Sequence, residues 1–115
     1  MARTVTTVQA TVFSALGEPS RLEIVELLRS RPYPVGEIAE ALDLRQPQVS
    51  KHLKVLAGTG IVGVEPRARQ RIYHLHAEPF DRIARWVDSF EHLWEVRLDS
   101  LGDYLTTNGP EEGTP

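Results

Sequence analysis

Basic and amide side chains gather in the middle of the chain, between Arg45 and His76, where they could bind the phosphates and base edges of DNA. This stretch holds six lysine and arginine residues and a single acid, Glu65, although the chain as a whole carries a net charge of −3. From Ala77 onward the balance is reversed, with nine acids against three arginines. Because lysine and arginine neutralise DNA phosphates, this clustering favours a DNA-binding surface over a merely solvated one.

The first part of this stretch, residues 46–57, predicts a helix whose outer face carries no acid. An inward stripe of Val49, Leu53 and Leu56 would turn the polar side chains outward. Lysines can then reach phosphates, while glutamine and serine can reach base edges in the major groove. A polar face that only aids solubility is the alternative. The predicted DNA-contacting residues here are Arg45, Gln46, Gln48, Ser50, Lys51, His52 and Lys54.

Two β-rich runs, residues 61–65 and 71–75, flank a basic loop over residues 66–70 and predict a hairpin. Arg67, Arg69 and Arg71 alternate in sequence, so within a strand they would share one face. Arginines at a hairpin tip suit the narrow minor groove of DNA. We therefore predict that residues 62–75 form a DNA-binding wing; an edge strand protected by charge against aggregation is the alternative.

Other elements must position these residues. The pattern predicts one helix over residues 4–16 and a second helix that begins at Ser20, because Ser20 to Glu23 has the pattern of a capping box. Residues 31–34 hold two prolines and predict a rigid connection. Residues 35–42 then form a short amphipathic helix, followed by a turn that contains Asp43. A short helix, a three-residue turn and a second helix have helix-turn-helix spacing. The predicted fold is mainly α with a small β-hairpin, a winged helix-turn-helix.

The C-terminal part predicts one long helix, from Glu78 to Leu105, with apolar residues three or four apart throughout. One small domain cannot cover so long an apolar seam, so we expect it to form a dimer interface. We expect one domain over 1–105 and a disordered tail over 106–115. The predicted interface residues are Val12, Phe80, Ile83, Val87, Phe90, Trp94, Leu98 and Leu101.

Several function classes find no support in the sequence. Cysteine is absent, which excludes disulfides and thiolate metal sites. No phosphate-binding glycine loop or nucleophile elbow occurs, so we expect neither an enzyme nor a cofactor. Asp88, His92 and Glu95 share one helical face, but a single histidine among acids is more often a surface residue, and we expect no metal site there. Without an apolar span or a signal peptide, we expect a cytoplasmic protein.

The chain resembles the arsenic-repressor (ArsR) family of winged-helix regulators, most specifically in the Gln-Pro-x-Val-Ser-x-His-Leu run over residues 46–53. Residues 13–25, 35–42 and 71–75 extend the resemblance. It implies a dimer formed through the first and last helices, and repression by binding a palindromic operator in double-stranded DNA. A winged helix that serves only protein interaction is the alternative function.

Two departures from the family are informative. Arg45 stands where the family often has a serine that caps the recognition helix, and a cation there opposes the helix dipole. We hypothesise that Arg45 instead contacts a phosphate. The segment 35–39 lacks the cysteines of metal-responsive members. The resemblance therefore favours members without a metal site, which act as simple autorepressors or answer to an unidentified small-molecule effector.

Overall fold

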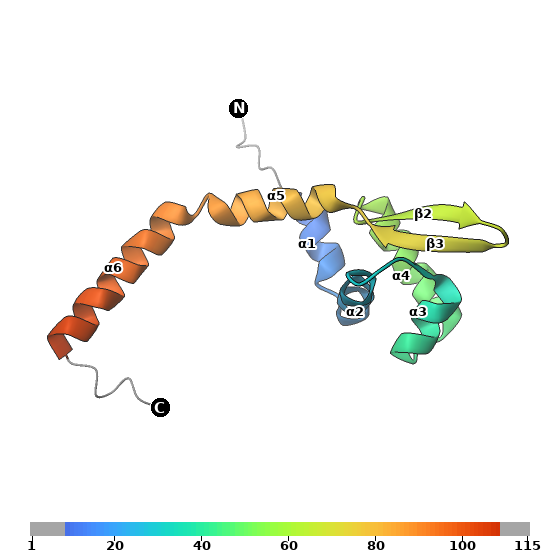
Figure 1. Cartoon of the computed structure of the whole chain (residues 1–115), viewed down its shortest axis with the longest axis horizontal. Helices are drawn as coiled ribbons and strands as arrows, with labels where there is room; N and C mark the ends of the chain where they lie inside the picture. Colours follow the sequence, from blue (N-terminus) through green and yellow to red (C-terminus); the bar gives the residue numbers. More distant parts are fainter. Residues whose placement is uncertain (1–8, 109–115) are drawn as a thin grey trace.

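The computed structural model describes residues 9–108, apart from the side chains of Trp94, Asp103 and residues 106–108. Helices dominate, and one small sheet completes the fold (Figure 1). This confirms the predicted mainly helical class with a hairpin. In chain order the elements are α1 (Ala10–Leu16), α2 (Pro19–Leu28), β1 (Tyr33–Pro34), α3 (Val35–Leu42), α4 (Gln46–Gly58), β2 (Val62–Arg67), β3 (Gln70–Leu75), α5 (Ala77–Asp88) and α6 (Glu91–Asn108).

The core lies where α1 to α4 meet the base of the hairpin. Each element contributes aliphatic side chains at helical or alternating spacing, and burying them away from water supplies most of the driving force for folding. The buried residues are Val12, Ala15, Ile24, Val25, Leu28, Ile38, Ala39, Val49, Leu53, Leu56, Ile61 and Val62.

The starts of the first two helices differ from the prediction. The first helix begins at Ala10, because Gln9 has an extended backbone (φ −85°, ψ 142°); residues 4–8 of the predicted helix lie outside the described residues. The predicted capping box at Ser20 is wrong. Pro19 occupies the first turn of α2, where its fixed φ suits a helix and its missing N–H is no loss. The cap is Glu18, whose carboxylate accepts the backbone N–H of Arg21 at 2.9 Å.

The helix-turn-helix forms as predicted from α3 and α4. Asp43 ends α3 in the left-handed conformation (φ 55°, ψ 47°), which aspartate tolerates better than most residues. The backbone N–H of Leu44 then donates to the carbonyl of Ala39 at 2.9 Å and closes the turn. Val49, Leu53 and Leu56 are fully buried, so they set which face of α4 is turned toward the core.

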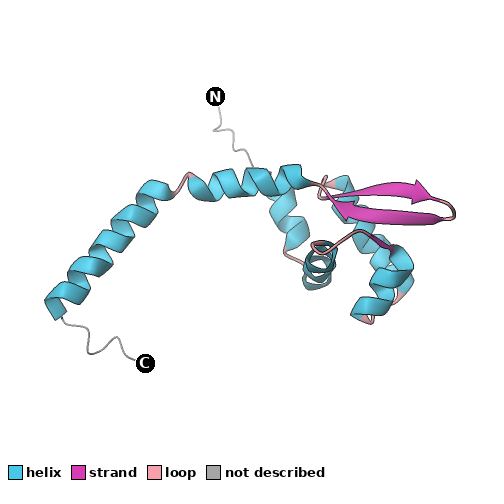
Figure 2. Cartoon of the chain, viewed as in Figure 1, coloured by secondary structure: helices cyan, strands magenta, loops and turns pink. Residues whose placement is uncertain are grey.

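The wing is a tighter hairpin than the sequence suggested. The strands run to Arg67 and from Gln70, which leaves a two-residue turn of Ala68 and Arg69 in place of the predicted five-residue loop. A third short strand, β1, pairs antiparallel with β3 at Ile72 and Tyr73. It was not predicted, because its two residues are too few to give a periodic pattern. Figure 2 shows the strands in magenta.

This register corrects the prediction that three arginines share one face. Arg67 pairs with Gln70, and Arg71 pairs with Pro66. Cross-strand partners point to the same face, whereas successive residues point to opposite faces. Arg67 and Arg71 therefore lie on opposite faces of the hairpin, and Arg69 lies in the turn.

The predicted single C-terminal helix is wrong, since it is interrupted between α5 and α6. The backbone N–H of Ser89 donates to the carbonyls of Arg85 and Trp86, and its Oγ donates to the Trp86 carbonyl at 2.6 Å. A serine side chain that bonds to the preceding turn competes with helix continuation. Beyond this break α6 projects away from the winged domain and continues to Asn108, past the predicted boundary at residue 105 (Figure 1). The other residues of the predicted tail, 109–115, lie outside the described residues.

Candidate nucleic-acid interface

The outer face of α4 is exposed and free of acids. Because the buried stripe turns the opposite face of the helix toward the core, the side chains predicted to contact DNA point to solvent, with the exception of His52. At the N-terminal end the backbone of Arg45 is extended, and its side chain makes no cap hydrogen bond. Arg45, Pro47, Gln48 and Lys51 surround an open hollow of about 530 Å³. This end therefore presents two cations beside the positive end of the helix dipole, which is an arrangement that attracts anions.

A groove runs between α4 and the wing. Ser50 and Lys54 line it from α4, and Arg71 and Tyr73 line it from β3, around a volume of about 850 Å³ that opens to solvent. Arg71 therefore lies on the face of the hairpin that is turned toward α4. The structure brings this arginine together with Lys54, which the sequence placed in a separate element.

The two other wing arginines lie away from this groove. Arg67 is on the opposite face, where its guanidinium is 3.9 Å from the carboxylate of Glu65. Both of these side chains are well exposed, and exposed ion pairs at such a distance contribute little to stability. Arg69 is exposed in the turn at the tip, so both guanidinium groups remain available to a ligand.

His52 is the predicted DNA-contacting residue that the structure turns inward. Only 15% of its side chain is exposed, and its Nδ1 lies 3.5 Å from Nη1 of Arg21 and 3.9 Å from Oε1 of Glu18. The backbone N–H of Arg21, donating to the Glu18 carboxylate, lowers the pKa of that carboxyl group. Sequence reasoning missed Glu18 and Arg21. The inward orientation of His52 could have been found from its spacing. His52 is three residues after the buried Val49 and therefore lies at the edge of the buried stripe.

The residues predicted at a dimer interface divide into two groups. Val12 is 7% exposed and belongs to the hydrophobic core described above, and Phe80 and Ile83 pack against the same core. The other predicted interface residues that the structure describes are exposed; the side chain of Trp94 is outside the described part of the chain. These exposed residues are Val87, Phe90, Leu98 and Leu101.

An aromatic cluster extends the exposed group and was not predicted as a unit. The rings of Phe13 and Trp86 are 5.3 Å apart, and those of Trp86 and Phe90 are 5.1 Å apart. Trp86, Phe90, Val87 and Leu93 surround a hollow of about 560 Å³ without any polar lining. This cluster therefore joins α1 to the end of α5 and the start of α6 in one apolar surface.

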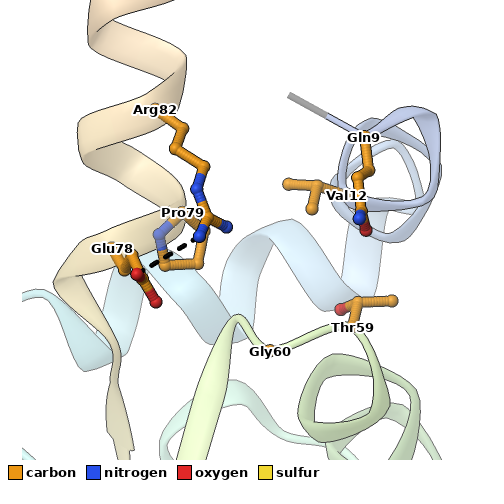
Figure 3. A pocket seen from close by; sticks show the side chains of 7 residues that line it. All are labelled: Gln9, Val12, Thr59, Gly60, Glu78, Pro79 and Arg82. Carbon is orange, nitrogen blue, oxygen red and sulfur yellow. Dashed lines mark ion pairs between the residues drawn. The ribbon is translucent and has the colours of Figure 1, made fainter. Parts of the chain in front are cut away.

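A smaller hollow of about 400 Å³ lies where α1, the end of α4 and the start of α5 meet (Figure 3). Glu78 and Arg82 form an ion pair of 3.2 Å at its edge. In the described part of the chain, no three His, Asp or Glu side chains come together as metal ligands. None of the described helices has the length and apolar character needed to cross a membrane.

A helix-turn-helix followed by a hairpin that flanks its second helix defines the class of winged helix-turn-helix DNA-binding proteins. Residues 18–64 match the family of bacterial regulatory proteins called the arsR family. The chain is 31% identical over 99 residues to the HTH-type transcriptional regulator Rv2034 of Mycobacterium tuberculosis, covering 86% of this chain and 90% of the relative. It is 37% identical over 92 residues to the biofilm growth-associated repressor of Agrobacterium fabrum, covering 80% and 76%.

Among solved structures, the fold is similar to the homodimeric winged helix-turn-helix DNA-binding domain of a possible ArsR-family regulator from Mycobacterium bovis. The TM-score is 0.61 at 27% identity, covering 73% of this chain and 80% of that one. The chain belongs to the ArsR family. It is a DNA-binding transcriptional regulator rather than an enzyme, as predicted.

Proposed function

We propose that the protein is a homodimeric repressor that places α4 in the major groove of a palindromic operator and the wing against the flanking backbone and minor groove. The observation that carries this proposal is the acid-free outer face of α4, which continues across the groove to Arg71. Both elements present positive charge on the same side of the molecule. A single DNA duplex can therefore contact both at once.

The proposed roles follow from side-chain chemistry. Gln46, Gln48 and Ser50 would reach base edges from the N-terminal half of α4. Arg45, Lys51 and Lys54 would bind phosphates on either side of the groove. Arg71 would bind the phosphate backbone beside α4, and Arg67 and Arg69 would reach the minor groove from the tip of the wing.

The proposed dimer uses the apolar surface of α1, α5 and α6. An exposed aromatic and aliphatic surface of this kind is unusual on a monomer and is typical of an interface. A twofold dimer presents two equivalent recognition helices, so its DNA site would be a palindrome. The M. bovis relative is homodimeric, and the A. fabrum relative is a repressor, which supports both parts of the proposal.

Two further proposals concern the compartment in which the protein acts and the site of a small-molecule effector. A regulator of transcription acts where the chromosome is, so we propose that it works in the cytoplasm of a bacterial cell. For a small-molecule effector we propose the apolar hollow beside Trp86, because a ligand there would lie on the proposed interface itself.

Selection of binding sites from a random pool of DNA duplexes tests the proposed function, with fluorescence anisotropy on the selected duplex. We expect a palindromic site and binding that weakens steeply with salt. Lys51→Ala should weaken binding and reduce the slope of log K against log salt by about 0.9, the value for one phosphate contact. Arg29→Ala, which removes the exposed arginine at the C-cap of α2, is the matched control and should leave both unchanged. A protein-interaction module would select no duplex.

Sedimentation velocity tests the dimer. Leu101→Asp places a charge on the proposed interface and should halve the sedimenting mass while weakening operator binding. Leu22→Asp is the matched control, because Leu22 is similarly exposed (46% against 52%) but lies on α2. Equal behaviour of the two variants would contradict an interface on α6.

A further inference from the structure

The side chain of His52 is held between the recognition helix and the start of α2, and this placement raises the question of what it does there. His52 belongs to α4, whereas its neighbours are Glu18, the N-cap of α2, and Arg21 in the first turn of that helix. Every other polar side chain of α4 is exposed. His52 therefore makes the polar contact that ties this helix to another element by side chains.

The contacts around Arg21 join three elements. Its Nε donates to the carbonyl of Ala15 near the end of α1 at 2.8 Å. Its backbone N–H donates to the carboxylate of Glu18 at 2.9 Å, and its Nη1 lies 3.5 Å from Nδ1 of His52. The guanidinium is thus anchored to α1 through Nε before it reaches α4. A side chain fixed in this way can set the position of the group that it contacts.

The chemistry of the pair fixes the tautomer of the histidine. A guanidinium has only donors, because it keeps its charge in proteins. Nδ1 of His52 must therefore accept, which leaves the ring proton of the neutral imidazole on Nε2. The carboxylate of Glu18, 3.9 Å from Nδ1, is beyond hydrogen-bonding distance and offsets the charge of Arg21 instead.

We infer that His52 is a positioning residue: its Nδ1, bound by Arg21, fixes the rotation and depth of α4 so that the outer face meets the DNA bases in register. This inference rests on the proposed function. The apolar stripe alone leaves α4 some freedom, because aliphatic contacts are not directional. A directional contact between α4 and Arg21, in the first turn of α2, removes that freedom. His52 itself makes no contact with DNA.

Two substitutions separate positioning from DNA contact. The amide oxygen of asparagine can occupy the place of Nδ1, whereas the longer glutamine places its amide near the position of Nε2. His52→Asn should therefore keep operator affinity within about twofold of the parent. His52→Gln should lose about fivefold to tenfold, as expected when a hydrogen bond to a charged group is removed. The loss should fall on the selected operator rather than on random duplex, because only base readout needs register.

The opposite result, rescue by glutamine and loss with asparagine, would assign His52 to the DNA and overturn the inference. Equal retention by both variants, or equal loss, would also overturn it. A double-mutant cycle with Arg21→Met adds a check: after Arg21→Met, changing His52 should have no further effect on affinity. Thermal melts of each variant show whether a loss of binding reflects unfolding.

Nitrogen chemical shifts of the imidazole in the DNA-free protein provide a readout independent of operator binding. At a pH where His52 is neutral, we expect Nδ1 to carry no proton and Nε2 to carry one. The reverse tautomer would overturn the inference. If the parent protein selects no duplex, the proposed function fails, while this measurement still decides whether Arg21 and His52 are paired as inferred.

Discussion

Replacing Arg45 with serine should change stability and DNA binding in opposite directions. Arg45 caps α4 with an extended backbone and no side-chain hydrogen bond, and its cation lies at the positive end of the helix dipole. Serine at this position can accept a backbone N–H of the first turn. Pro47 has no N–H, so the N–H of Gln48 is the group available to a serine cap.

The structure indicates how much stability a serine cap at position 45 should add. The N–H of Gln48 already reaches the carbonyl of Arg45 at 3.0 Å, so the cap should contribute about 0.5–1 kcal/mol, the low end of the usual range. Removing the unfavourable cation adds about 0.3 kcal/mol. For a domain of this size, a total near 1 kcal/mol raises Tm by about 4–8 °C. On operator DNA the same variant should lose one phosphate contact, which lowers the salt slope by about 0.9.

Thermal unfolding followed by circular dichroism measures the first effect, and anisotropy at several salt concentrations measures the second. Arg45→Ala separates the two causes, because it loses the cation without gaining a cap and should show the full binding loss with a smaller rise in Tm. Arg29→Ser is the control for removing an exposed arginine and should leave binding unchanged. An Arg45→Ser protein with unchanged Tm would refute the capping argument, and one with unchanged affinity would refute the phosphate contact.

Three further predictions concern stability. The pKa of Glu18 is lowered below its ordinary value near 4.5, chiefly by the backbone N–H of Arg21, so the ionised carboxylate stabilises the fold above that pH. In thermal melts at a series of pH values, the parent should be more stable than Glu18→Gln at pH 7, and this advantage should disappear as the pH falls through the lowered pKa. Ala68→Gly should stabilise the protein by about 0.5–1 kcal/mol in urea titrations, because glycine relieves the positive φ of 56° in the wing turn at the cost of a more flexible unfolded chain; a loss of stability would contradict this reading of the turn. Leu53→Ala should cost about 2–5 kcal/mol in the same titrations, since Leu53 is fully buried, and a cost below 1 kcal/mol would mean that α4 is not seated as described.

The helix-turn-helix shows which features of the fold the local sequence pattern predicts. The spacing of Ile38, Ala39 and Val49 gave both helices and their buried faces, and the turn residue Asp43 indicated where the first helix ends. These features follow from interactions within about ten residues, so they can be read from the chain directly. The acid-free face of α4 was predictable for the same reason.

Two features of the hairpin and the C-terminal helices were not predictable from apolar periodicity. The faces of Arg67 and Arg71 depend on the strand register, which a two-residue turn decides and which a shift of one residue would reverse. The break at Ser89 depends on a side chain that donates to the carbonyl of Trp86 in the preceding turn, a bond that apolar periodicity does not record.

The sequence by itself determined the class of protein, the order of its elements and the charge on the recognition helix, because periodicity and composition act locally. Only the tertiary structure decided which of those residues face the same way. It turned His52 from the DNA side toward Arg21, 31 residues earlier in the chain, and brought Arg71 beside Lys54. The physical reason is that such contacts are set by how whole elements pack together, and packing depends on the shape of the entire core.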